Sequence, residues 1–168
     1  FVAPFSERHF GADYPDLAFV EARRRNALPP NVKVSEFYLQ SGSLLNNAGA
    51  QSGYTSLNYT FVARDLAEIG INVVVQMVAR CSRTGRERYS LASNPDVTQD
   101  LVDAMDSTGR PRPLVVGVVH PDLPFVGNEA EVGAEFFDVL LDDPACAHTL
   151  FALPREPVGI AEFALGLH

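Results

Sequence analysis

The sequence contains no hydrophobic run approaching the roughly 18 residues that a membrane-spanning helix needs. Positive charge is also scarce: 13 Lys and Arg against 21 Asp and Glu give a net charge of −8, which argues against a nucleic-acid or anionic-membrane surface. The two cysteines, Cys81 and Cys146, follow no metal-binding or redox spacing. We interpret both as small apolar residues in a reducing compartment. These absences predict a soluble, cytoplasmic protein.

The length and composition favour one globular domain. The chain has 168 residues, of which 46% are hydrophobic and 20% charged, enough to bury a single core. Its first five residues are apolar, without an initiator Met or the basic region of a signal peptide. Residues 156–168 read as the opening turns of an amphipathic helix, with Ile160, Phe163 and Leu167 on one face. We therefore expect a piece of a larger protein, whose chemistry lies partly outside these residues.

Apolar periodicity and turn residues predict an α/β fold. Helices are expected over 16–27, 56–70 and 94–109, and strands over 32–39, 72–79 and 114–119. The segment 136–141 is ambiguous between strand and helix, and we favour a short strand. Asn58 and Asn94 are the expected helix caps, and the stretch 40–51 reads as a loop. The run 72–79 is almost wholly apolar, which is typical of a strand covered on both faces. The order predicts one three-layer α/β domain with a mainly parallel sheet.

Parallel sheets bind ligands at the carboxyl ends of their strands, which here lead into 80–88, 120–122 and 42–53. None of these segments carries a phosphate-loop or dinucleotide-binding motif. Arg80, Arg83, Arg86 and Arg88 form either an anion site or, as we favour, a solvated hairpin. Gln76 is a lone amide in an apolar strand and either enters a site or hydrogen-bonds loop backbone.

Asn58, Tyr59 and Thr60 cluster at a predicted helix start, where they cap the helix or receive an anion. The four histidines, His9, His120, His148 and His168, have no metal-binding spacing, so no metal site is expected. Residue types alone suggest a Cys81–His120 pair, and nothing else supports it.

Three acids, Glu129, Glu131 and Glu135, could share acid–base work, but a solvated loop is the favoured interpretation. From the residues alone, the sequence predicts a fold class and no mechanism.

Short motifs, the first at residue 53, follow one another in an order that resembles the acetyl-CoA hydrolase/CoA-transferase family. The resemblance covers most of the chain from about Val32 onward. The motifs are 53–60 (GYTSLNYT), 63–66 (ARDL), 70–76 (GINVVVQ), 88–98 (RYSLASNPDVT), 109–111 (GRP), 122–125 (DLPF), 130–132 (AEV), 136–138 (FFD), 150–151 (LF), 156–158 (EPV) and 160–168 (IAEFALGLH). The resemblance rests on their number and order, since none is a catalytic signature. Phe61 is a departure, because members of the family tend to have His after Asn-Tyr-Thr.

The resemblance implies a CoA-transferase-like fold of two related α/β domains with the active site between them. Such enzymes move CoA between carboxylic acids, or to water, through a glutamyl-CoA thioester, so acyl-CoA is a substrate and no cofactor is held tightly. The nucleophilic Glu of the family lies beyond His168, so no catalytic residue is assigned in this chain. Implied partners are the missing C-terminal domain, acyl-CoA and carboxylate substrates, and a second copy in a homo-oligomer.

Five residues are the predicted substrate-binding groups: Gln76, Ser93, Asn94, Asn58 and Tyr59. The leading hypothesis is the N-terminal domain of an acetyl-CoA hydrolase or CoA-transferase, inactive alone. The alternative is a stand-alone, non-catalytic binding or regulatory domain of the same fold. A third hypothesis is an enzyme that uses residues such as Cys81.

Overall fold

The computed structural model describes residues 17–39, 42, 44–83, 85–93 and 95–146. They belong to one compact unit, Asp16–Ala147. The predicted helix at 156–168 lies outside the described residues. Among those described, no helix is long and apolar enough to cross a membrane.

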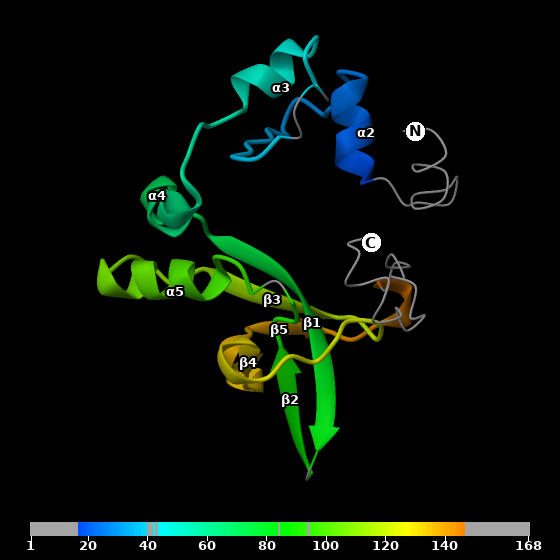
Figure 1. The fold of residues 1–168 in the computed structure, drawn as a ribbon, viewed down its shortest axis with the longest axis vertical. Coiled ribbons are helices and arrows are strands. Elements are labelled where there is room, and N and C mark those ends of the chain that lie inside the picture. The colour runs from blue at the N-terminus through cyan, green and yellow to red at the C-terminus, as the bar shows by residue number, and fades with distance from the viewer. Residues whose placement is uncertain (1–16, 40–41, 43, 84, 94, 147–168) are drawn as a thin grey trace, which may run out of the picture. The chain divides into compact units, whose positions relative to one another are not determined.

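A five-stranded sheet forms the centre of this unit (Figure 1). Its strands are β1 (Val73–Arg83), β2 (Arg86–Ser90), β3 (Leu114–Val119), β4 (Glu131–Val132) and β5 (Val139–Leu141). Their order is β4-β2-β1-β3-β5. The pairs β1–β3 and β3–β5 are parallel, whereas β1–β2 and β2–β4 are antiparallel. The sheet is therefore mixed, with a parallel half and an antiparallel edge.

Strand β1 belongs to both halves. Its first part pairs with β3 from Val73 to Val78, and its second part pairs with β2 from Ala79 to Arg83. The second part and β2 form a hairpin that extends past the parallel strands (Figure 1). The solvated-hairpin interpretation of 80–88 is thus confirmed in its backbone, and residues after Val78 stand at the carboxyl edge of the parallel strands.

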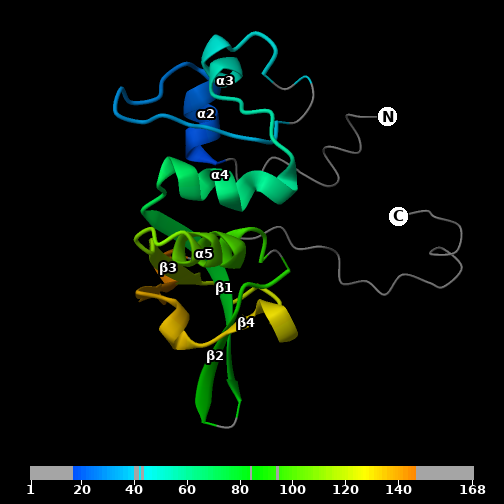
Figure 2. The ribbon, with the colours of Figure 1, turned by 90° about the vertical axis from the view of Figure 1, so that its left-hand side faces the viewer.

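Two helices, α4 (Val62–Ile69) and α5 (Thr98–Ser107), pack against each other beside the sheet (Figure 2). The 3-10 turn η1 (Tyr59–Phe61) leads into α4, and Gly70 ends it in the left-handed conformation with φ 80°. This agrees with the predicted stop, because glycine adopts positive φ without strain. Helix α5 begins at Thr98 after Val97, later than the predicted start at Pro95, and Asn94 lies outside the described residues.

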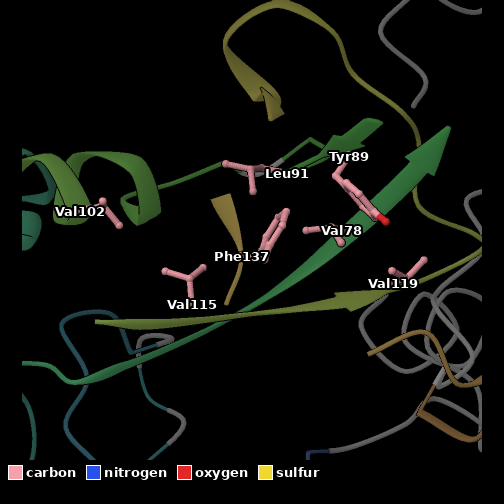
Figure 3. Close-up of a cluster of buried hydrophobic side chains, with 7 residues drawn as sticks. All are labelled: Val78, Tyr89, Leu91, Val102, Val115, Val119 and Phe137. Atoms are coloured by element: carbon pink, nitrogen blue, oxygen red, sulfur yellow. The ribbon is translucent and has the colours of Figure 1, made fainter. Parts of the chain in front are cut away.

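The core lies between one face of the sheet and these helices. Figure 3 shows Phe137 among side chains from the strands and α5. The cluster consists of Val78, Tyr89, Leu91, Val102, Val115, Val119 and Phe137. A second cluster joins Ala67 of α4 to Leu101 and Met105 of α5. We call this side of the sheet, which carries Val78, Val115, Gly117 and Val119, the packed face.

The opposite side, which we call the open face, consists of apolar side chains that alternate with those of the packed face. They include Val73, Val75, Met77, Leu114, Val139 and Leu141, each at least 39% exposed among the described residues. The sequence predicted that strand 72–79 is covered on both faces. In the part of the chain that the structure describes, only one face is covered.

The part that precedes η1 departs most from prediction. The first helix is confirmed as α2 (Ala18–Arg24), but 32–39 is no strand and makes one isolated bridge, Glu36 to Tyr54. Within the described ranges its backbone pairs with residues 53–55 at Glu36 alone, whose N–H donates to the Gly53 carbonyl at 3.0 Å and whose carbonyl accepts from the Thr55 N–H at 2.9 Å. The predicted loop 40–51 instead ends in a helix, α3 (Ala48–Ser52), because the Asn47 side chain accepts a hydrogen bond from the Ala50 N–H at 2.8 Å.

Short 3-10 turns complete the connection from β3 to the end of the described chain. They are η2 (Asn128–Ala130), η3 (Ala134–Phe136) and η4 (Pro144–Cys146). The predicted strands 72–79 and 114–119 are confirmed as β1 and β3, and the ambiguous segment 136–141 forms a short strand, β5. The central sheet with its flanking helices is consistent with the predicted three-layer α/β domain, of which the described residues form the sheet and the helical layer on its packed face.

Candidate ligand site at the carboxyl edge of the sheet

The carboxyl ends of the three parallel strands meet at one cavity of about 420 Å³. Arg80 reaches it from β1, His120 follows β3 directly, and Asp142 follows β5 directly. Two of the three segments predicted to lie at this edge, 80–88 and 120–122, therefore come together. The third, 42–53, does not belong to the edge, because the strand predicted before it does not form.

Arg80 and Asp142 form an ion pair across this edge. Their side chains are 38% and 49% exposed, so both remain accessible to water and to a ligand. The pair joins residues 62 positions apart in the sequence. An exposed ion pair of this kind contributes about 1 kcal/mol or less to the free energy of unfolding, so the fold does not depend on it.

His120 is fixed at the base of the cavity and is only 2% exposed. Its backbone N–H donates to the Val78 carbonyl at 2.9 Å, which continues the β1–β3 ladder by one residue. Its Nδ1 accepts a hydrogen bond from the Asp122 N–H at 3.1 Å. A neutral ring with Nδ1 as acceptor carries its proton on Nε2.

The loop that follows His120 is held by Ser90, which is fully buried at the end of β2. The Ser90 hydroxyl donates to the Val126 carbonyl at 2.6 Å and accepts from the Val126 N–H at 3.0 Å. It also accepts from the Ala92 N–H at 3.1 Å. Ser90 thus ties the loop wall of the cavity to the antiparallel edge of the sheet.

Tyr89 lies opposite Arg80 in the β1–β2 register and is 4% exposed. Its hydroxyl donates to Glu87 at 3.0 Å. Burial raises the pKa of the Tyr89 phenol above 10, the hydrogen bond to Glu87 and the charges of Glu87 and Asp142 raise it further, and Arg80 opposes them. The phenol is therefore neutral at pH 7 and acts as a hydrogen-bond donor.

The cavity combines polar groups with an apolar wall. The apolar side is formed by Val119, Pro121, Leu123 and Pro144, and Asp143 adds a second carboxylate. Its volume is in the usual range for small-molecule sites, roughly 300–1,000 Å³. The arrangement can receive a ligand that has an apolar portion and a group that bonds to a guanidinium.

The predicted substrate-binding residues lie elsewhere. Gln76 is half-buried in β1, where its Oε1 accepts from the Thr98 hydroxyl at 2.8 Å and its Nε2 donates to the Met77 carbonyl at 3.1 Å. These bonds tie β1 to the start of α5. Ser93 is exposed in the turn before α5, and Asn94 lies outside the described residues. None of the four that the structure describes, Gln76, Ser93, Asn58 and Tyr59, lines the cavity.

Asn58 and Tyr59 stand together at the start of η1. The Asn58 Oδ1 accepts from the Thr60 N–H at 3.1 Å and from the Thr60 hydroxyl at 3.0 Å, so the residue caps the turn. The Tyr59 ring is 52% exposed and meets Phe37 edge-on, with centroids 5.3 Å apart. Phe61, where the family tends to have His, lies under the Arg64 guanidinium at 4.5 Å.

The remaining sequence candidates have structural partners or no shared site. Arg88 of the arginine cluster forms an ion pair with Glu131. The Glu135 carboxylate lies against Gly133. Cys81 is half-buried on β1 and does not line the cavity that holds His120. Within the described ranges, no three His, Cys, Asp or Glu side chains gather as a metal ion would require.

Sequence reasoning missed Asp142, Ser90 and Tyr89 as members of this edge. Asp142 was noted only as the end of a strand, although a carboxylate directly after a parallel strand is the available signal. Ser90 and Tyr89 lie beside the cavity without lining it, and they could not be found because the register between β1 and β2 decides which residue lies opposite Arg80.

No model of a known protein family matches the chain, and no curated protein matches it. Among solved structures, the crystal structure of RipA from Yersinia pestis is similar, with a TM-score of 0.50 and 18% sequence identity. The match covers 73% of this chain and 28% of that one. The likeness supports the α/β fold, and the chain spans little more than a quarter of that protein's length.

Proposed function

We propose that this chain is the first domain of an acyl-CoA hydrolase or CoA-transferase and that the carboxyl-edge cavity is its wall of the substrate site. The observation that carries the proposal is the convergence of Arg80, His120 and Asp142 at the ends of three parallel strands. Ligands of open α/β sheets bind at this edge. The ordered motifs from residue 53 onward supply the family.

In this role the described chain binds and orients, and the nucleophile comes from a second domain. Arg80 would bond to an anionic or carbonyl oxygen of the substrate in exchange for Asp142, since both side chains are accessible. The apolar wall around Leu123 would cover the acyl portion. In this proposal CoA and acyl-CoA are substrates, and the reaction takes place in the cytoplasm.

The first test measures free-thiol release from acetyl-CoA by the purified 168-residue chain, with and without a carboxylate acceptor. We expect no release above background, because the nucleophilic Glu of the proposed enzyme belongs to the second domain. Clear turnover would contradict the absence of a nucleophile, and Cys81 and the acids from Glu129 to Glu135 would be the first residues to substitute.

The second test separates binding from catalysis. Acetyl-CoA is titrated into the chain, and binding is followed by NMR line broadening of the ligand. Arg80→Met should lose the effect, whereas Arg88→Met, which removes an ion-paired arginine from the same hairpin, should retain it. Equal binding by both variants would rule out the cavity as the site.

A stand-alone binding domain is the second candidate function. It is favoured by the ion pair between Arg80 and Asp142, because the cavity holds a guanidinium and a carboxylate whose charges are already balanced. It predicts saturable ligand binding without turnover even when the chain is extended past His168, whereas the enzyme proposal predicts turnover by the extended chain.

A further inference from the structure

A second cavity, of about 470 Å³, lies in the part of the chain before η1, between α2, the turn that follows it and α3. Apart from Gly53, its lining residues lie outside the family-like motifs, and none belongs to the carboxyl-edge site. Two polar side chains that line it are more than nine-tenths buried: Arg23 from α2, at 4% exposure, and Asn47 from the start of α3, at 6%. Groups of this kind are costly to bury unless they are held by hydrogen bonds.

Both side chains are held in this way. The Arg23 guanidinium forms an ion pair with Glu36 and donates to the Ala50 carbonyl at 3.0 Å. The Asn47 Nδ2 donates to the Arg23 carbonyl at 2.7 Å, and its Oδ1 caps α3 through Ala50. The wall is therefore preorganised, with polar groups from separate segments fixed around one space.

The cavity also has an unbalanced positive charge. Arg23 is matched by Glu36, but Lys33, which lines the same cavity, has no ion-pair partner among the described residues. Asn26 adds a side-chain amide from a backbone with φ 53°. The Ser52 hydroxyl lies in the same wall and donates to the Gly49 carbonyl at 3.1 Å. An excess cation beside amide donors suits an anion with several acceptor oxygens.

We propose that this cavity binds a phosphate group, with Lys33 as its charged contact and Arg23 and Asn47 as its fixed wall. A tetrahedral oxyanion can accept from donors that converge from several directions, as the α2, turn and α3 residues do here. The site is independent of the carboxyl-edge cavity, because the two cavities have no lining residue in common.

The chain offers a selective reporter, because Lys33 is its only lysine. Reductive methylation with ¹³C-formaldehyde labels Lys33 and the terminal amine. Inorganic phosphate is then titrated in at constant ionic strength, with sodium chloride and sodium succinate as parallel arms. The expected result is a saturable shift of the Lys33 methyl signal with phosphate. A linear shift, or the same shift with chloride, would overturn the proposal, and tighter succinate binding would overturn the assignment to phosphate.

Charge variants test the contact itself. Lys33→Gln should weaken phosphate binding about tenfold, as loss of a charge-assisted hydrogen bond does, while Lys33→Arg should retain most of it. Arg86→Gln removes an equal charge from the exposed hairpin and is the matched control. Because Lys33→Gln and Lys33→Arg lack the methylated lysine, binding is followed in all three variants by the NMR shifts of the Gly49 and Gly53 backbone amides. Equal affinity of Lys33→Gln and Arg86→Gln would overturn the assignment.

Filling the cavity tests its location. A Cβ at Gly49 would lie 3.5 Å from the Asn47 Oδ1 and 4.0 Å from the Asn26 Oδ1, both ordinary contacts. Gly49→Ala should therefore fold at least as well as the original chain, since alanine favours the helix. Gly49→Leu should block phosphate while the chain keeps its circular dichroism spectrum. Undiminished phosphate binding by folded Gly49→Leu would place any anion site elsewhere.

Discussion

The two faces of the parallel sheet are made from the same strands, yet they have opposite environments. On the packed face, Val78 and Val115 are fully buried. On the open face, Val75 is 66% exposed and Leu114 is 44% exposed, within the described residues. Strand alternation sends neighbouring side chains to opposite faces, so the sequence makes both faces apolar while only one is covered here.

This difference shows that an apolar parallel strand predicts burial of its side chains. It does not show which segment of the protein packs over them. On the packed face, α5 and Phe137 provide the cover. On the open face no described helix does so. Parallel sheets are normally covered on both faces, and among the described residues the open face lacks that cover.

The sharpest test places the same charge on each face. Val115→Asp should destabilise the chain by roughly 4 kcal/mol or more, because it buries a carboxylate without a partner. Val75→Asp should cost less than about 1 kcal/mol, because the side chain reaches water. Urea unfolding followed by circular dichroism measures both. If both variants unfold alike, the open face is covered in solution.

A second test adds volume to each face of β3. A Cβ at Gly117 would lie 2.8 Å from the Leu140 Cδ2 and 2.8 Å from the Phe137 Cδ1, and Phe137 is itself packed edge-on against Tyr89 and Phe136. Gly117→Val should cost about 1–3 kcal/mol through overpacking. Val116→Ile, on the opposite face, should cost less than about 0.5 kcal/mol. Thermal unfolding compares them, and equal losses would contradict the assignment of faces.

The third test uses pH at the packed face. The folded-state pKa of Tyr89 is raised above 10, so the folded chain holds this proton more tightly than the unfolded chain. Its contribution is fully present below pH 10 and is lost as pH rises through the folded-state pKa. Tyr89→Phe should cost about 1 kcal/mol at pH 8, and this difference should shrink above pH 10.

Urea unfolding between pH 8 and 11 measures that difference. Tyr38→Phe, which changes a ring that is 76% exposed, is the matched control and should alter neither the stability nor its pH dependence. A Tyr89→Phe difference that grows with pH would contradict the sign of the shift.

The smallest effect is expected at the carboxyl edge, where the packed face meets solvent. Arg80→Met should change the free energy of unfolding by at most about 1 kcal/mol, because the ion pair with Asp142 is partly exposed. Thermal unfolding at low and high salt measures it, and the small difference should shrink further with salt. A large, salt-independent loss of thermal stability would mean that Arg80 stabilises the fold, and it would contradict its role as an accessible ligand-binding group.

Much of the parallel half could be predicted from the sequence. The apolar runs at β1 and β3, and the glycine stop at Gly70, are local signals, so periodicity and turn residues were sufficient. The segment before η1 could not be predicted as well. Alternation at 32–39 resembles a strand, but a strand needs a hydrogen-bonded neighbour, and local sequence does not report whether one is present.

The sequence predicted where in the sheet the candidate site lies better than it predicted which residues form the site. His120 and Arg80 follow parallel strands directly, so they were expected at the edge. Asp142 joins Arg80 across a separation of 62 residues, and Gln76 is turned toward Thr98 by the packing of α5 on β1. Such pairings depend on strand order and register, which single-residue patterns do not contain.

By itself, the sequence determined the α/β class, the strands of the parallel half and the glycine stop of α4 at Gly70, because these follow from side-chain periodicity and backbone preferences within a few residues. Only the tertiary structure decided which face of the sheet is covered, which charged groups meet at its carboxyl edge, and that Arg23 and Asn47 enclose a second cavity. The physical reason is that burial and ion pairing depend on distances between residues far apart in the chain, and those distances are set only when the elements pack.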